Sequence, residues 1–95
     1  MTEVQFRKFK EGDVIAVFPY EMWNKSGDVT SYMHVGQHGS ASWDINNFTK
    51  AATPEEYADL KAELERIGYE LKVIKRRNHN KYLKAYYEIK RNNTK

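Results

Sequence analysis

The sequence contains no cysteine among its 95 residues. Disulfides, thiolate nucleophiles and cysteine-based zinc or iron–sulfur sites are therefore excluded, and the absence fits a reducing compartment. No apolar stretch approaches the roughly 18 residues of a membrane-spanning helix. The first ten residues alternate charged with apolar side chains and lack the apolar region of a signal peptide. We therefore expect a soluble, cytoplasmic protein that does not enter a membrane.

Motifs of nucleotide and metal chemistry are also missing. There is no GxGxxG or Walker-type loop, no HExxH pair, and no RNP or zinc-finger signature. His34 and His38 lie four residues apart with Asp44 downstream, but this spacing brings two ligands together only on a helix. We place His34 on a strand face and His38 in a turn. We therefore expect no metal site and no cofactor.

The segment around Ser40 and Ser42 contains the residue types of a nucleophile, a base and an orienting acid, with His38 and Asp44 nearby. These groups must converge in space to act, and the strand–turn–helix elbow that presents a nucleophile is absent. Glycine and serine in a loop need no catalytic explanation. We therefore expect no enzymatic activity and infer no small-molecule substrate.

The first half of the chain reads as strands. Residues 4–9 and 14–18 alternate or are β-rich, and a Gly-Asp turn separates them, so they predict a β-hairpin. Pro19 cannot donate a ladder hydrogen bond, so we expect it to end the second strand or mark an edge. A cluster of turn residues precedes a third predicted strand at 29–35.

Residues 36–50 have no periodicity and are rich in Gly, Ser, Asn and Asp, which predicts a long loop. Loops of this length in compact domains are often functional. We expect Trp43, Ile45 and Phe48 to anchor it to the core. Exposed indoles also serve as interface anchors, so Trp43 is a candidate interaction residue, although a tryptophan in a loop more often completes its own core.

The most secure element is a helix that starts at Pro54. Thr53 and Glu56 form a capping box around the proline, and Gly68 supplies a left-handed stop. A strand with alternating apolar residues follows and ends in basic residues 75–77. The helix has one apolar stripe, made of Tyr57, Leu60, Leu64 and Ile67.

The last element, at 79–91, fits either a strand or a helix, and its Leu, Ala, Lys and Glu content favours a helix. The predicted order is therefore β-β-β-α-β plus this short element. We predict one small α+β domain over residues 1–95, an antiparallel-rich sheet with a helix packed on one face, and disorder in the last few residues. Residues 9–15 resemble the entry turn of SH3-like barrels, so a curled SH3-like barrel with a helix is the alternative.

Charge is distributed unevenly along the chain. Residues 69–95 carry a net charge of +7, whereas residues 1–68 carry −4. A cationic segment attracts polyanions, so a nucleic acid or an acidic protein is the expected partner. Tyr82, Tyr86 and Tyr87 are interleaved with the cations and could stack on bases. The candidate nucleic-acid-binding residues are Lys72, Lys75, Arg76, Arg77, Lys81 and Lys84.

Two other interpretations stay open. The predicted helix at 54–67 is acidic, with five Asp/Glu against two Lys/Arg, so it could neutralise the basic segment. The long loop at 36–50, with Trp43, could instead make the protein a protein–protein interaction module.

Several blocks of the chain resemble a group of short proteins from Bacteroides-type gut bacteria, their phages and their mobile elements. The resemblance runs through roughly residues 6–75 and is weakest beyond Arg77. It implies an origin in a mobile element or its host. The group has no assigned activity, so the resemblance implies no site residue. The blocks are FRKFKEGDVIAVFP at 6–19, SYMHVGQH at 31–38, ATPEEY at 52–57 and IGY at 67–69.

Overall fold

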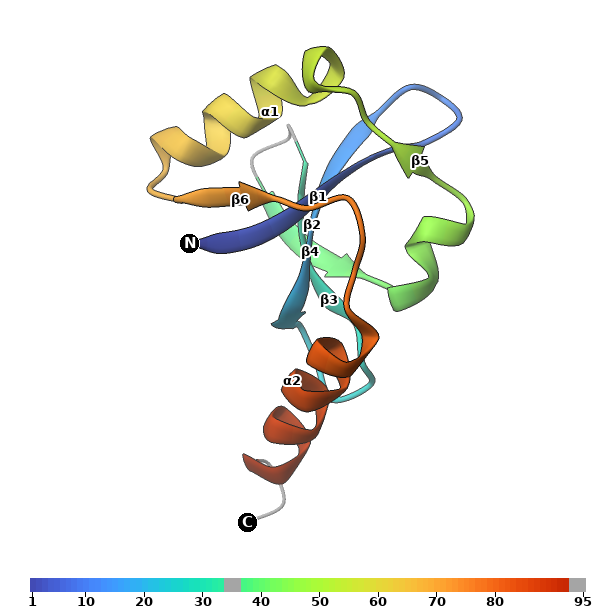
Figure 1. Cartoon of the computed structure of the whole chain (residues 1–95), viewed down its shortest axis with the longest axis vertical. Helices are drawn as coiled ribbons and strands as arrows, with labels where there is room; N and C mark the ends of the chain where they lie inside the picture. Colours follow the sequence, from blue (N-terminus) through green and yellow to red (C-terminus); the bar gives the residue numbers. More distant parts are fainter. Residues whose placement is uncertain (34–36, 93–95) are drawn as a thin grey trace.

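The computed structural model of this protein describes residues 1–33 and 37–92 and confirms the α+β class. Helix, not strand, forms the C-terminal element. The expected disorder at the end concerns residues 93–95, which lie outside the described residues. Figure 1 shows the sheet between the two helices. The elements are β1 (Thr2–Lys8), β2 (Val14–Met22), β3 (Val29–Met33), β4 (Gln37–Ala41), the 3₁₀ helix η1 (Trp43–Asn47), β5 (Lys50–Ala51), α1 (Pro54–Arg66), β6 (Leu71–Val73) and α2 (His79–Asn92).

The six strands form one sheet in the order β4-β3-β2-β1-β5, and β6 also pairs with β1. Four of the pairings are antiparallel, and the pairing of β1 with β6 is parallel. The sheet stays open, so the SH3-like barrel alternative is wrong. One edge is β4, and β5 and β6 share the other edge, beside β1.

The β1–β2 hairpin is confirmed. Gly12 adopts a left-handed φ of 104°, and the Phe9 N–H donates to the Asp13 carbonyl at 2.9 Å. Strand β1 alternates as expected: Val4 and Phe6 pack under α1, and the side chain of Gln5 bonds to the segment that leads to α2.

The expectation that Pro19 ends the second strand is wrong. β2 continues through the buried Pro19 to Met22. Its register with β3 shifts between Phe18 and Met22, so the missing N–H falls where the ladder is already irregular. Bulges of this kind tolerate proline.

The predicted long loop is also wrong, because 37–51 contains β4, η1 and β5. The side chains of β4 show no apolar periodicity, and its backbone pairing with β3 makes it a strand. Ile45 is buried and Trp43 half-buried, as expected. Phe48 is 57% exposed and does not anchor the chain. Residues 34–36, where the third strand was expected to run into this segment, lie outside the described residues.

Helix α1 begins as its sequence predicts. The Thr53 hydroxyl accepts from the Glu56 N–H at 3.3 Å, and the Glu56 carboxylate accepts from the Thr53 N–H at 2.9 Å. Leu60 and Leu64 are fully buried against the sheet, whereas Ile67, expected in the same stripe, is 54% exposed. The left-handed Gly68 ends the helix.

Helix α1 packs on one face of the sheet, as predicted, and helix α2 covers the opposite face. Its Tyr82 packs against Ile15, Val17 and Ile45, and its hydroxyl donates to the Gly27 carbonyl at 2.8 Å. The far end of α2 projects from the body, and the molecule measures 43 × 29 × 21 Å (Figure 1). Within the described residues, neither helix is long and apolar enough to cross a membrane.

Candidate nucleic-acid interface

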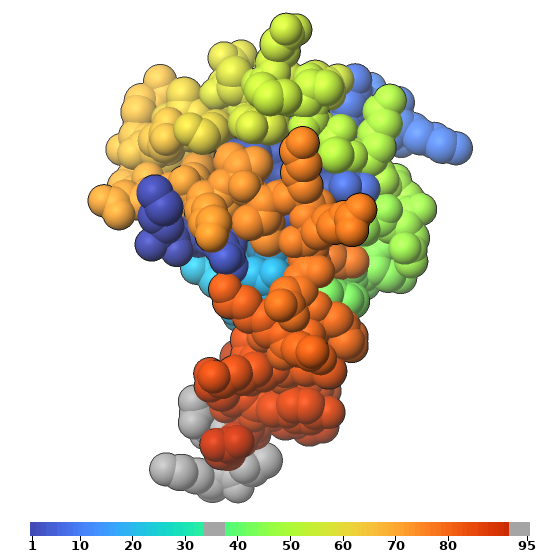
Figure 2. Space-filling model, in the orientation of Figure 1, coloured from blue at the N-terminus to red at the C-terminus, as the bar shows by residue number. Residues whose placement is uncertain are grey.

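Strand β6 and the segment that joins it to α2 run across one face of the molecule, between the two helices (Figure 2). Lys72, Lys75 and Arg76 on this stretch are exposed, and so is Lys84 on α2. Within residues 1–33 and 37–92, none of these four side chains forms an ion pair or a hydrogen bond. Four of the six predicted cations therefore keep an uncompensated charge.

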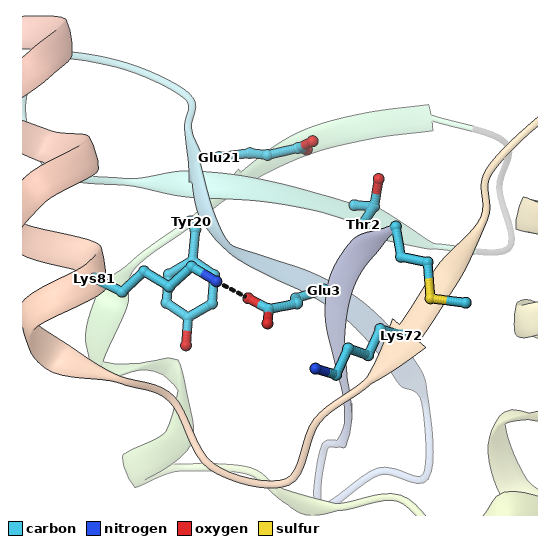
Figure 3. A pocket seen from close by; sticks show the side chains of 7 residues that line it. Thr2, Glu3, Tyr20, Glu21, Lys72 and Lys81 are labelled. Carbon is cyan, nitrogen blue, oxygen red and sulfur yellow. Dashed lines mark hydrogen bonds and ion pairs between the residues drawn. The ribbon is translucent and has the colours of Figure 1, made fainter.

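The charge of Lys81 is compensated by a carboxylate of the same chain. Its ammonium group forms an ion pair with Glu3 at 2.7 Å and lies 4.7 Å from the centroid of the Tyr20 ring. The hydrogen bond to Glu3 raises the pKa of Lys81. Figure 3 shows Lys81 and Lys72 on either side of Glu3, in an open hollow of about 530 Å³.

Arg77 is built into the fold. Its guanidinium carbon lies 3.7 Å from the centroid of the Trp43 ring, and its Nη1 donates to the Trp43 carbonyl. Burial lowers the pKa of Arg77, and the neighbouring charge of Arg7 lowers it further. A group with these contacts is less available to a partner than an exposed lysine.

The ring of Trp43 is covered by neighbouring side chains on the α2 side of the sheet. Its ring stacks on Tyr82 with centroids 3.8 Å apart and an interplanar angle of 21°. Together with the Arg77 contact, this packing favours a tryptophan that completes its own core. Tyr82 is buried, whereas Tyr86, like Trp43, is half-buried. Of the three tyrosines expected to stack on bases, Tyr87 is the most accessible, at 55% exposed.

Arg7 is a cation whose role the sequence did not indicate. Its Nε donates to the Thr49 hydroxyl at 3.1 Å, and its Nη2 donates to the carbonyls of Thr49 at 2.7 Å and Asn46 at 3.4 Å. Burial lowers the pKa of Arg7. None of the ion pairs between described residues includes it. The available signal was a strand cation on the face opposite the apolar Val4 and Phe6.

The acidic helix α1 binds other cations. Glu56 pairs with Lys8 of β1, and Glu65 pairs with Lys61 one turn away at 3.0 Å. Neither carboxylate contacts the basic segment. The charge on β6 and its connection to α2 therefore remains open to an external anion.

Three of the residues weighed for metal or catalytic chemistry, His38, Ser42 and Asp44, have hydrogen-bond partners in the fold. His38 lies in β4 rather than in the expected turn, and its Nε2 is 2.8 Å from the Tyr69 hydroxyl. The Ser42 hydroxyl donates to Asp44. In the described part of the chain, no group of three or more His, Asp or Glu side chains could hold a metal ion, and His34 lies outside it.

Comparison of the chain with known protein families, with curated proteins and with solved structures found no match. The resemblance to short proteins of Bacteroides-type bacteria and their phages therefore stays a prediction. The candidate interface rests on the charges and contacts of the chain itself.

Proposed function

We propose that this protein binds nucleic acid weakly and without sequence preference. The observation that carries the proposal is a set of exposed cations without carboxylate partners among the described residues, three of them on one short segment. Cations of this kind release counterions from phosphates, which supplies most of the affinity of non-specific binding. The residues are Lys72, Lys75, Arg76 and Lys84.

In this proposal Arg77 and Lys81 contribute less to phosphate binding than the four exposed cations. A phosphate that recruited Lys81 would have to displace Glu3, and one that recruited Arg77 would compete with the carbonyl and ring of Trp43. Arg77 instead fixes the start of α2 relative to η1. Lys84 follows Lys81 by three residues on α2, so the two side chains share one face of the helix.

The proposal describes a cytoplasmic binding protein rather than an enzyme. The resemblance to phage and mobile-element proteins supports a role as an accessory factor of such an element. An acidic protein is the competing partner, because carboxylates would answer the same cations. The interaction-module alternative gains nothing from Trp43, whose ring already packs on Tyr82 and Arg77.

The test is the salt dependence of binding. Fluorescence anisotropy would measure the affinity for a labelled single strand and a labelled duplex of arbitrary sequence over a series of salt concentrations. We expect Lys75→Gln combined with Arg76→Gln to reduce the slope of log affinity against log salt by about 1.4 for the single strand, since each lost phosphate contact removes about 0.7.

A matched control separates a local interface from net charge. Lys25→Gln combined with Lys61→Gln removes the same charge from the β2–β3 turn and from α1, so the slope should stay unchanged. Equal slopes in the two double variants, or no binding at the lowest salt concentration, would rule out the proposed interface.

A further inference from the structure

Strands β5 and β6 lie one after the other along the same edge of β1, each beside a different part of it. β5 runs antiparallel beside the C-terminal part of β1, and β6 runs parallel beside its N-terminal part. Each strand leaves the sheet before they meet, after a last bond to β1: Ala52 N–H to the Phe6 carbonyl, and Ile74 N–H to the Val4 carbonyl, both at 2.9 Å. The chain then turns into α1 on one side and toward α2 on the other. The divergence opens a notch in the edge.

The notch between β5 and β6 has a volume of about 360 Å³. Tyr57, Val73 and Ile74 belong to its mostly apolar lining, and Arg7 and Lys75 add two positive charges. None of the lining residues, all of them described, is acidic. An apolar pocket with a few convergent charges is typical of a small-ligand site, and its volume is within the range for such sites.

Part of the Arg7 guanidinium group has no hydrogen-bond partner among the described residues. Its Nε and Nη2 bond to Thr49 and Asn46, and among the described residues its Nη1 takes part in no hydrogen bond. These acceptors are neutral, so the charge itself is not compensated. Partly buried charges are normally paired, and a guanidinium group matches the geometry of a phosphate.

We propose that the notch binds a nucleotidyl phosphate, with the phosphate between Arg7 and Lys75 and the remainder of the nucleotide against the apolar lining. The inference rests on the proposed function, because it takes the occupant from the polyanion that the exposed cations would bind. Lys75 belongs to both surfaces. A nucleic-acid strand bound along the exposed cations would therefore reach the notch at Lys75.

Arg7 also has a structural role that its removal would disturb. It binds carbonyls in and just after η1 and so holds the chain that enters β5. The decisive variants are therefore Lys75→Gln and Ala51→Leu. The fold uses the Lys75 backbone carbonyl, which accepts from Gln5 Nε2 at 3.0 Å, whereas the Lys75 side chain is exposed. Ala51 is exposed and lines the notch, so leucine there fills space without changing charge.

The experiment follows backbone amide shifts by NMR during titration with mononucleotides, inorganic phosphate and a short single strand. We expect saturable shifts at residues 51–54 and 73–75 of the wild-type protein. Lys75→Gln should weaken nucleotide binding about tenfold, the factor for losing one charge-assisted hydrogen bond. Ala51→Leu should weaken the binding of mononucleotides and affect the binding of inorganic phosphate less, because leucine fills the apolar part of the notch. Lys50→Gln is the control, since Lys50 is in β5 but lines a different hollow.

The outcomes separate this inference from the proposed function. A single nucleic-acid strand could bind with a steep salt slope, shift none of these amides, and bind the Ala51→Leu variant as tightly as the wild type. That result would rule out binding in the notch and leave the proposed function standing. Mononucleotides that shift the amides when no strand binds would support the notch with free nucleotide as its source and overturn the proposed function. Shifts by strand and mononucleotide together support both.

Discussion

The two faces of the sheet are stabilised by different kinds of contact. On the face under α1, Val4, Phe18, Leu60 and Leu64 are completely buried in a cluster whose buried members are apolar apart from the Tyr32 hydroxyl. The face toward α2 has a second apolar cluster, but its border contains long polar side chains that bond to backbone carbonyls: Gln5, Arg7, Arg77 and Tyr82.

The two faces differ in the groups that they leave available for contact with a ligand. Apolar burial is non-directional and leaves no group to offer a ligand. The α2 face instead has guanidinium groups whose hydrogen-bond partners are neutral, and exposed lysines lie on the neighbouring segment. The α1 cluster therefore stabilises the fold, whereas the exposed cations lie on β6, on the segment that leads to α2 and on α2 itself.

Leu64→Ala should have the largest effect on this comparison. Leu64 is fully buried, so its truncation leaves a cavity and should lower the free energy of unfolding by about 3 kcal/mol. Urea denaturation followed by circular dichroism measures the change. Ile67→Ala, near the end of the same helix but at a residue 54% exposed, is the matched control and should change stability by less than about 0.5 kcal/mol. Similar losses in the two variants would contradict the assigned core.

Tyr82→Phe probes the α2 face. The substitution keeps the ring on Trp43 and removes the hydroxyl that donates to the Gly27 carbonyl, so we expect a loss of about 1 kcal/mol. The melting temperature and the urea midpoint measure it. Tyr87→Phe, at an exposed ring on the same helix, should leave both values unchanged. If Tyr82→Phe were neutral, the polar contacts of this face would not stabilise it.

The smallest effect concerns an ion pair on the α1 side. The hydrogen bond from Lys8, followed by that from the Thr53 backbone, lowers the pKa of Glu56 from 4.5 to about 2. A carboxylate with a lowered pKa in the folded state contributes stability that is complete above pH 4.5 and is lost as the pH falls toward 2. We expect the melting temperature of Glu56→Gln to fall less than that of the wild type over this interval.

Glutamine at this position can still accept from the Thr53 N–H, so the capping box should persist in that variant. Glu55→Gln, at an exposed neighbouring position in the first turn, serves as the control and should follow the wild-type pH profile. Parallel profiles for the wild type and Glu56→Gln would show that the Lys8 pair does not stabilise the fold.

The elements that could be predicted from sequence are those specified by neighbouring residues. The capping box at Thr53, the left-handed Gly68 and the Gly12 turn each act over a few positions, and all three appear as expected. Strand β4 could not be predicted, because its Gly- and Ser-rich sequence becomes a strand by pairing with β3. Pro19 was misjudged because the register shift that accommodates it requires the β3 partner.

The candidate site shows the same division. Its location in the basic segment follows from the positions of Lys and Arg along the chain. The contribution of each cation does not, because their partners are distant in sequence: Trp43 is 34 residues from Arg77, and Glu3 is 78 residues from Lys81. Arg7 lines a notch that the sequence could not indicate, because the notch depends on how β5 and β6 pair with β1.

The sequence alone therefore determined the α+β class, the α1 helix and the excess of positive charge near the C-terminus. These follow from propensity, capping and composition, which act locally or need no geometry at all. Tertiary structure decided which cations remain exposed, because charge compensation depends on distances in space between residues from different elements. It also decided that a partly buried arginine and an exposed lysine, distant in sequence, line the same notch.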